Sequence, residues 1–397
     1  MSLPMMGHAD SCLRIDLDAI ITNWRYIDGL SSATTTTAAM VKANGYGLGA
    51  KEVATALARA GCTEFFVANL GEAIELRQHL DEGGYERLHI MTLHGCHLDQ
   101  LDDYAAFRIT PVLNDLEQLS RWRLFSQQRQ KIQPNTGANT GANTGAKTGS
   151  KTGPGRLPAM LHIDTGMTRL GLDADQADWL IQNKAALDGL DCRYIMSHLS
   201  SAEVTGDPTN AAQLAAFNEL RSWFPGMPAS LANSAGSMLS PDFHFQMTRP
   251  GSALYGVYPG DIPTGKLAPV VRWQARIMQV RRAKAGDRVG YGGTHQLGRD
   301  STIATIGAGY ADGYNRMLGG KAQVLIGSQT APVVGEVSMD SMTVDVTDVD
   351  STHLRPGTVE LLHDSYDLSH MAGDAETISY EILTKLGTRP KRHYLNS

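Results

Sequence analysis

The feature that most constrains the fold is an alternation of short apolar runs with helix-like stretches between residues 40 and 245. Strand-like runs that are separated by helical crossovers imply βαβ units and a parallel sheet. Around eight such units suit a closed (β/α)8 TIM-type barrel better than an open sheet. The expected strands are residues 38–41, 64–68, 88–93, 108–113, 159–163, 194–197 and 229–233, and the clearest helices are residues 50–60 and 71–80.

The pattern changes after about residue 270. Apolar runs at residues 275–280, 301–306, 322–326 and 342–346 are separated by Gly, Asp and Pro turns, which is typical of a mostly antiparallel β domain. We therefore predict two domains. The barrel is expected over residues 12–270 and the C-terminal β domain over residues 271–397.

A low-complexity insertion interrupts the expected barrel at residues 134–156. Its core, residues 135–153, consists of near-repeats of Asn-Thr-Gly-Ala and Lys-Thr-Gly that have almost nothing to bury. We expect a disordered surface excursion, because long insertions cost little closure entropy. A phosphate-cradling loop is the alternative, but the segment lacks the Lys-Ser/Thr ending and the apolar helix that follow in such loops.

The composition favours a small molecule as the ligand. The 397 residues carry a formal net charge of -6 and no basic block, which argues against a nucleic-acid surface. No apolar run has the length of a signal peptide or a membrane span, so we expect a cytoplasmic protein. The four cysteines include no Cys-x-x-Cys pair, which fits reduced thiols.

A group of possible metal ligands lies at His89, His94, Cys96 and His97. These are residue types that bind zinc. His89, however, falls in an alternating strand-like run, and the other three fall in the turn that follows. We interpret the group as a surface turn and predict no metal site.

A single lysine closes the first apolar run. Lys42 follows residues 38–41, and a glycine-rich turn with one tyrosine, Tyr46, comes next. Glycines allow the backbone to approach an anion closely, and a phenol can bind a phosphate oxygen. A desolvated lysine forms Schiff bases with carbonyl compounds such as pyridoxal phosphate. A solvated lysine beside a flexible loop is the alternative.

Other polar groups follow later strands. In a barrel, ligand-binding groups cluster at the carboxyl ends of the strands. Together these ends offer an amine, two guanidiniums, an imidazole and hydroxyls, a set that suits an anionic aromatic aldehyde. In chain order they are Lys42, residues 164–169, His198, Asn233-Ser234 and Arg249-Pro250-Gly251-Ser252.

These blocks resemble the signature motifs of the alanine racemases. The match runs from about residue 13 to residue 394 and leaves out only the repeat insertion. So many blocks in the same order are far more specific than any one of them. The blocks are Lys42 with Tyr46-Gly47-Leu48-Gly49, Asp164-Thr165-Gly166-Met167-Thr168-Arg169-Leu170-Gly171, Ser197-His198, Asn233-Ser234-Ala235, Arg249-Pro250-Gly251 with Tyr255-Gly256, Val289-Gly290-Tyr291-Gly292, Gly309-Tyr310-Ala311-Asp312-Gly313 and Val337-Ser338-Met339-Asp340.

The resemblance implies pyridoxal phosphate as the cofactor, alanine as the substrate, and a homodimer whose active sites combine one barrel with the partner's β domain. It implies that Lys42 binds the cofactor covalently and that Arg249 contacts its pyridine nitrogen. Because arginine keeps its proton, that nitrogen stays unprotonated, which weakens the ring as an electron sink and suppresses side reactions. The other implied cofactor contacts are Tyr46, Ser234, Gly251 and Ser252 at the phosphate, His198 against the ring, and Asn233.

Racemisation removes a proton from one face of Cα and returns it on the other, which calls for two acid/base groups. The resemblance implies Lys42 on the D-alanine side and Tyr291 of the partner chain on the L-alanine side. A phenol with a pKa near 10 needs nearby cations to lose its proton more easily. Arg169 and the backbone amide of Met339 are expected at the substrate carboxylate, and Tyr310 is expected to narrow the pocket.

Two positions depart from the family pattern. His162 stands where many alanine racemases carry a lysine that is modified to a carbamate, and this group orients the arginine. We therefore expect Arg169 to be held by an ion, a water or His162 itself. Thr388 stands where a phosphate-binding tyrosine often precedes the final arginine, so that contact is expected to be lost or reduced.

The expected function is the interconversion of L- and D-alanine, which supplies D-alanine for peptidoglycan. One alternative is a racemase that acts on serine, on another small amino acid or on a broad range of amino acids, or a related decarboxylase. A non-catalytic pyridoxal phosphate carrier is a third possibility. Such carriers resemble the barrel half only, so Tyr291 and Met339 in the β domain speak against it.

Overall fold

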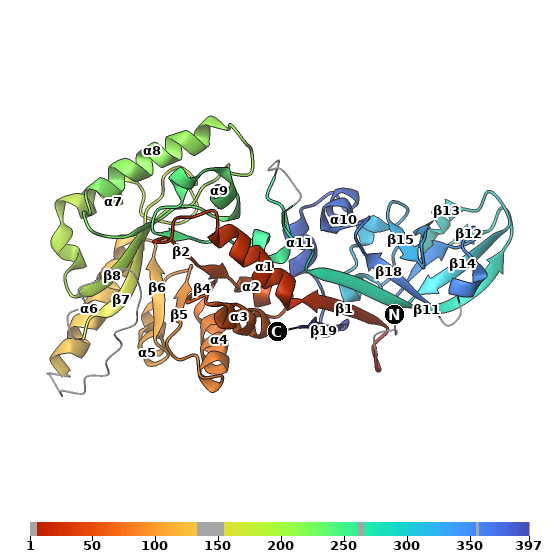
Figure 1. Ribbon diagram of the computed structural model, residues 1–397, viewed down its shortest axis with the longest axis horizontal. Coiled ribbons are helices and arrows are strands. Elements are labelled where there is room, and N and C mark those ends of the chain that lie inside the picture. The colour runs from red at the N-terminus through yellow and green to blue at the C-terminus, as the bar shows by residue number, and fades with distance from the viewer. Residues whose placement is uncertain (1–5, 133–154, 261–265, 355–356, 397) are drawn as a thin grey trace. The chain divides into compact units, whose positions relative to one another are not determined.

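The computed structural model describes residues 6–132, 155–260, 266–354 and 357–396. The predicted insertion core, residues 135–153, lies outside these ranges. The chain divides into two compact units (Figure 1). The barrel unit comprises Ile20–Gly45 and the described residues of Ala50–Leu267. The β unit comprises the described residues up to Ala19, the segment Tyr46–Gly49, and the described residues from Ala268 onward.

The barrel unit is built on a parallel sheet in the order β2-β10-β9-β8-β7-β6-β5-β4-β3. The two end segments, β2 (Thr36–Thr37) and β3 (Ala39–Met40), are separated by Ala38 alone. Because β2 pairs with β10 and β3 pairs with β4, the nine described segments close into a barrel of eight staves, which confirms the predicted class. The other staves are β4 (Glu64–Val67), β5 (His89–Thr92), β6 (Ile109–Leu113), β7 (Leu157–His162), β8 (Leu190–Met196), β9 (Ala229–Ser230) and β10 (Met247–Thr248).

Helices connect the staves, and their starts and buried faces follow from the sequence. The predicted helix 50–60 is confirmed as α3 (Ala50–Ala60), which buries Val53, Ala54 and Leu57 on one face. Asn69 caps α4 (Leu70–Glu82) through a bond that its Oδ1 accepts. The remaining helices are α1 (Leu17–Asp28), α5 (Leu101–Ala106), α6 (Leu116–Ile132), α7 (Ala174–Gln182), α8 (Pro208–Ser222) and α9 (Ser234–Leu239).

The β unit contains a mostly antiparallel sheet in the order β16-β15-β18-β11-β1-β19, in which β14 also pairs with β11, and β17 pairs with β14. The predicted barrel begins at residue 12, but β1 (Ser11–Asp16) pairs with β11 and, in parallel, with β19 of the β unit. The other elements are β11 (Val271–Ala283), β12 (Arg288–Val289), β13 (His295–Gln296), β14 (Ser301–Ile306), β15 (Gln323–Ile326), β16 (Gln329–Pro332), β17 (Met342–Asp345), β18 (Thr358–Leu362), α10 (Leu368–Asp374), α11 (Ser379–Thr384) and β19 (Lys391–Leu395).

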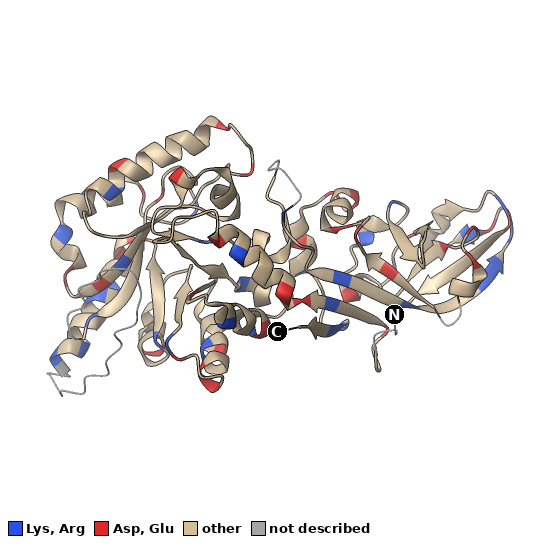
Figure 2. Cartoon of the chain, in the orientation of Figure 1, with Lys and Arg blue, Asp and Glu red and all other residues tan. Residues whose placement is uncertain are grey.

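Charges of both signs are distributed along the elements of each unit. Figure 2 shows Lys and Arg interspersed with Asp and Glu, for example along α4. No helix among the described residues is long and apolar enough to cross a membrane.

Candidate active site

Lys42 lies at the carboxyl end of the stave that opens the barrel. Met40 and Val41 before it are buried, whereas Lys42 itself is half-buried. Burial lowers the pKa of its amine, the charge of Arg169 lowers it further, and Glu72 opposes the shift. The amine therefore carries an unshared electron pair at lower pH than an ordinary lysine, as a nucleophile or a base requires.

The segment after Lys42 is a left-handed turn, α2 (Lys42–Tyr46). Ala43, Asn44 and Tyr46 have φ of 51°, 53° and 53°. Each such residue costs about 1–2 kcal/mol in this conformation. Side-chain bonds hold the turn: the Ala43 amide donates to Glu72 Oε1 at 2.8 Å, and the Ala50 amide donates to Asn44 Oδ1 at 3.0 Å. Strain that is held in this way is common beside reacting groups.

Arg169 is presented by a loop that follows β7. Both oxygens of Asp164 accept backbone amides of this loop, from Gly166, Met167 and Thr168 at 2.7–3.0 Å. The loop then returns to its origin, where Leu172 and His162 share a backbone bond of 2.9 Å. Asp164 thus shapes the turn, while Arg169 remains exposed.

His162 is buried beside Asn114, a residue that the sequence interpretation did not identify. Its Nδ1 lies 2.8 Å from Asn114 Oδ1. The Asn114 amide nitrogen donates to the carbonyls of Leu93 and Val112, so its oxygen must accept and His162 Nδ1 must carry the proton. Burial, followed by the charge of Arg249, lowers the pKa of His162 to about 3. The side chain is therefore neutral, and it brings no negative charge to Arg169.

His198 follows β8, and the charges that act on its imidazole come from several of the predicted residues. Its pKa is lowered well below the usual value, first by burial and then by Arg249, Arg169, His162 and Lys42. The barrel unit therefore brings these predicted residues into one electrostatic neighbourhood at the carboxyl ends of the staves. A neutral imidazole is the form that such a cationic setting favours.

Arg249, directly after β10, is buried and anchored to two neighbouring staves. Its Nη1 donates to Ser230 Oγ, and its Nη2 donates to the carbonyls of Ser197 and Leu231 at 2.6 and 3.3 Å. Burial lowers its pKa to about 9, so the guanidinium is charged at neutral pH. Arg249 Nε donates no hydrogen bond to any residue that the structure describes. This nitrogen can therefore donate to a ligand.

A small cluster of donors forms where β9 and β10 end. Ser234 Oγ accepts the backbone amides of Gly251 and Ala253 at 2.8 and 3.3 Å. Ser252 lies between them and is buried. Asn233 Oδ1 accepts the Gly236 amide and so caps α9. This cap positions Ser234, the first residue of the helix, and uses the Asn233 side-chain oxygen for that purpose.

These groups fit an anionic aromatic aldehyde. Lys42 offers an amine whose pKa is lowered, and Arg249 Nε offers a donor that suits a ring nitrogen. The amides of Gly251 and Ala253 converge on Ser234 Oγ, and convergent amides of this kind can bind phosphate when its oxygens replace the hydroxyl as their acceptor. The barrel unit thus offers groups of the kinds that an anionic aromatic aldehyde requires.

The β unit holds the other predicted residues. Tyr310 and Met339 lie on adjacent loops, because the Tyr310 amide donates to the Ser338 carbonyl at 3.0 Å and the Ala311 amide donates to the Met339 carbonyl at 2.9 Å. A Cβ added at Gly309 would lie 2.4 Å from two of these carbonyl oxygens. Glycine is therefore needed here for the close approach of the two loops.

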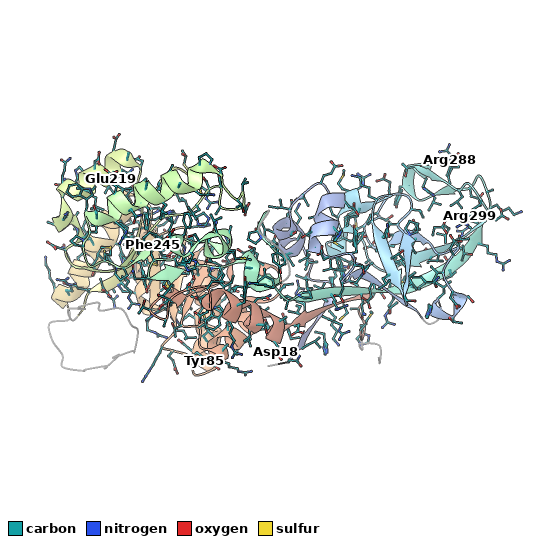
Figure 3. The ribbon with its side chains drawn as sticks, turned by 45° about the horizontal axis from the view of Figure 1, so that its top comes forward. Asp18, Tyr85, Glu219, Phe245, Arg288 and Arg299 are labelled. Atoms are coloured by element: carbon teal, nitrogen blue, oxygen red, sulfur yellow. The ribbon has the colours of Figure 1, made fainter. Side chains whose placement is uncertain are left out.

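Tyr291 lies at the tip of the hairpin that β12 and β13 form. Gly290 and Gly292, on either side of it, have φ of 73° and 69°. Arg288, which is labelled in Figure 3, donates from Nη1 to the Gly293 carbonyl at 2.9 Å and stabilises the hairpin. The Tyr291 side chain itself is 76% exposed in the single chain.

Two further predicted positions belong to the β unit. Tyr46 is grouped with it, and burial, with a contribution from Tyr380, raises the pKa of its phenol. Thr388 is exposed, and the neighbouring Arg389 forms ion pairs with Asp340 and Asp312 at 2.6 and 3.3 Å.

The histidine-rich turn contains no metal-binding arrangement in the part of the chain that the structure describes. No group of three or more His, Cys, Asp or Glu residues there could hold an ion. His89 pairs instead with Glu64 of the neighbouring stave at 2.7 Å.

Comparison with known proteins identifies the family. The family model described as the N-terminal domain of alanine racemase matches residues 15–259, and the one for the C-terminal domain matches residues 270–394. The chain belongs to the alanine racemase family. The family resemblance and the racemase class that the motifs predict are thereby confirmed.

Relatives of this family align along almost the whole chain. An alanine racemase of Rhodospirillum rubrum is 39% identical over 393 residues, which cover 98% of each chain. A catabolic alanine racemase of Agrobacterium fabrum is 37% identical, and the alignment covers 98% of this chain and 93% of that protein. The solved alanine racemase of Bartonella henselae, which carries covalently bound pyridoxal phosphate, is 37% identical with a TM-score of 0.87 and coverage of 98% of this chain and 100% of its own.

Three residues of the site are not among those predicted from the sequence. Asn114 follows β6 and could have been found by the same strand-end argument as the others. Glu72 stands three residues after Asn69, a helix-capping pattern, but nothing in that pattern names Ala43 as its partner. Ser230, which supports Arg249, has no recognisable signal.

Proposed function

We propose that this chain interconverts L- and D-alanine with pyridoxal phosphate bound covalently to Lys42. The observation that carries the proposal is the gathering of Lys42, Arg169, Arg249 and His162 around His198 at the carboxyl ends of the staves. An amine whose pKa is lowered, among fixed cations, suits an anionic aldehyde cofactor. The relatives named alanine racemase, and the cofactor in the Bartonella henselae structure, support this choice.

In this proposal the barrel residues hold the cofactor as follows. Arg249 donates from Nε to the ring nitrogen, and His198 lies against the ring. Ser234 and the backbone amides of Gly251 and Ser252 bind the phosphate, together with the phenol of Tyr46, while Asn233 supports Ser234 through its cap. Bound there, the cofactor would withdraw electrons from the amino acid and so acidify its Cα–H bond.

Two side chains of this protein would move the proton. Lys42 acts on the D-alanine face, and its lowered pKa brings the amine closer to the neutral pH at which a general base works best. Tyr291 of the partner subunit acts on the L-alanine face. Arg169 and the partner's backbone amide of Met339 orient the substrate carboxylate, and Tyr310 of the partner subunit restricts the pocket to small side chains.

A homodimer with shared active sites is part of the proposal. Tyr291, Met339 and Tyr310 are 76%, 53% and 45% exposed in the single chain. Exposed aromatic and Met side chains, two of which lie here on adjacent loops, are typical of a surface that a partner covers. We propose that the barrel of a second copy covers them.

The biological role that we propose is the supply of D-alanine for peptidoglycan in the cytoplasm. None of the four cysteines forms a disulfide, which fits a reducing compartment. The Agrobacterium fabrum relative is named catabolic, so a catabolic role is the alternative. Deletion of the gene distinguishes the two roles. A biosynthetic role predicts growth that depends on added D-alanine, whereas a catabolic role predicts poor growth on alanine as a carbon source.

The substrate is tested by incubating purified protein with L-alanine, L-serine or L-lysine and separating the enantiomers by chiral chromatography. We expect D-alanine to form fastest. Racemisation of serine or lysine alone would replace this proposal by the serine or broad-range alternative. The Lys42→Ala variant should form no product and should lose the absorption at about 420 nm that a lysine-bound cofactor gives; retention of that band would contradict the role of Lys42.

A further inference from the structure

We infer that Glu72 is a positioning residue for Lys42, whose carboxylate ties the left-handed turn after the lysine to the end of the neighbouring stave. The inference rests on the proposed function in that Lys42 is the reacting amine. It adds a residue that the family motifs did not single out. Glu72 lies in the first turn of α4 and is half-buried.

The carboxylate uses both of its oxygens on backbone amides. Oε1 accepts the Ala43 amide at 2.8 Å, and Oε2 accepts the Ala68 amide at 2.8 Å. The Ala43 amide belongs to the peptide that directly follows Lys42. Ala68 directly follows β4, so one side chain joins the ends of two adjacent staves. Bonds to an ionised acceptor are stronger than those between neutral groups.

The helix does not need this arrangement for its own start. Asn69 already caps α4 by accepting the Glu72 amide at 3.1 Å. In a capping box, the Glu side chain would return to the amide of the capping residue itself. Here Glu72 instead accepts from the preceding residue, Ala68, and reaches across to Ala43 with its second oxygen. The position therefore serves the Lys42 turn as well as the helix.

The turn requires such a bond because its backbone is strained. Ala43, Asn44 and Tyr46 all have positive φ, a conformation that persists only where the surroundings impose it. The Ala43 amide is the first donor of this segment. Fixing it fixes the direction in which the Lys42 side chain leaves the backbone.

The same carboxylate is also the anionic influence on the Lys42 amine. Burial and Arg169 lower the pKa of Lys42, Glu72 raises it, and His198 lies in the same neighbourhood. The two effects of Glu72 can be separated. Glu72→Gln removes the charge and places an amide donor against one of the two backbone donors, whereas Glu72→Asp keeps the charge but is too short to reach both.

The first measurement is hydrogen exchange of the purified full-length protein, followed by mass spectrometry on the peptide that covers residues 42–46. Loss of a bond to a charged acceptor should raise exchange of this peptide about tenfold or more in Glu72→Gln, and in Glu72→Asp as well. Glu75→Gln, on the exposed side of the same helix, is the matched control and should exchange like the parent. Parental exchange in Glu72→Gln overturns the inference. If that variant does not fold, parental exchange in Glu72→Asp does so.

The second measurement is the pH dependence with which an amine-acylating reagent labels Lys42 in full-length protein freed of cofactor. The midpoint should move to lower pH in Glu72→Gln and stay near the parental value in Glu72→Asp and Glu75→Gln. An unchanged midpoint in Glu72→Gln contradicts the electrostatic part. Neither readout depends on turnover, so a protein that fails to racemise alanine refutes the proposed function while this inference is still tested.

Discussion

Acid should destabilise the folded chain through His162, and replacing this residue should remove that sensitivity. His162 is 7% exposed, and burial together with Arg249 lowers its pKa to about 3, against about 6.5 in an unfolded chain. Below pH 6.5 the unfolded chain binds this proton and the folded chain does not. Stability is therefore present above pH 6.5 and is lost progressively as the pH falls toward 3.

The size of the effect follows from the two pKa values. One proton that binds only to the unfolded chain changes the free energy of unfolding by about 1.4 kcal/mol per pH unit. Between pH 7.5 and pH 4.5, His162 should account for a loss of about 2.5 kcal/mol. Glutamine at this position can still donate to Asn114 Oδ1, at the place where the imidazole donates now, and it does not titrate.

The assay is urea unfolding of the parent and of His162→Gln at both pH values. All other titrating groups contribute to both proteins, so the quantity of interest is the difference between the two losses. The parent should lose about 2.5 kcal/mol more than the variant. His94→Gln, at an exposed histidine of the barrel unit, is the control and should behave like the parent. Equal losses in the parent and His162→Gln would refute the reasoning.

Two further variants test the supports of the site. Asn114 is 5% exposed and its side chain makes three hydrogen bonds, so Asn114→Ala should lower the free energy of unfolding by about 3 kcal/mol in urea, whereas Asn218→Ala on the exposed face of α8 should stay within about 0.5 kcal/mol; equal effects would contradict the role of Asn114. A Cβ at Gly309 would lie 2.4 Å from the carbonyl oxygens of Ser338 and Met339, so Gly309→Ala should raise the KM for alanine by about tenfold in steady-state assays, while Gly298→Ala, with nothing within 4 Å, should not; a parental KM in Gly309→Ala would show that the loop contact does not position Met339.

Much of the secondary structure of both units follows from hydrophobic periodicity. Residues 50–60 form α3 and residues 301–306 form β14, as predicted. Each run is long enough for its apolar residues to show a helical or a strand periodicity. Lys42, His198 and Arg249 were found because polar residues that follow buried strands meet at one end of a barrel. The order of strands and polar residues along the chain is enough to place these side chains together.

The features that the sequence could not predict depend on partners far along the chain. β1 pairs with strands that begin some 260 and 380 residues later, and no local pattern contains that choice. The glycine-rich segment after Lys42 indicated a turn, but the left-handed conformation of Ala43, Asn44 and Tyr46 depends on contacts such as that with Glu72. Non-glycine residues in this conformation carry little signal of their own.

The central claim, that Lys42 of one subunit acts with Tyr291 of the other, is tested most directly by mixing two inactive variants. Lys42→Ala and Tyr291→Phe are each expected to lose racemase activity. When the two are dissociated together and reassociated, half of the dimers should be mixed, and each mixed dimer should contain one intact site. We predict that the mixture recovers about a quarter of the parental activity per subunit. Activity that stays at the level of the separate variants would contradict the account.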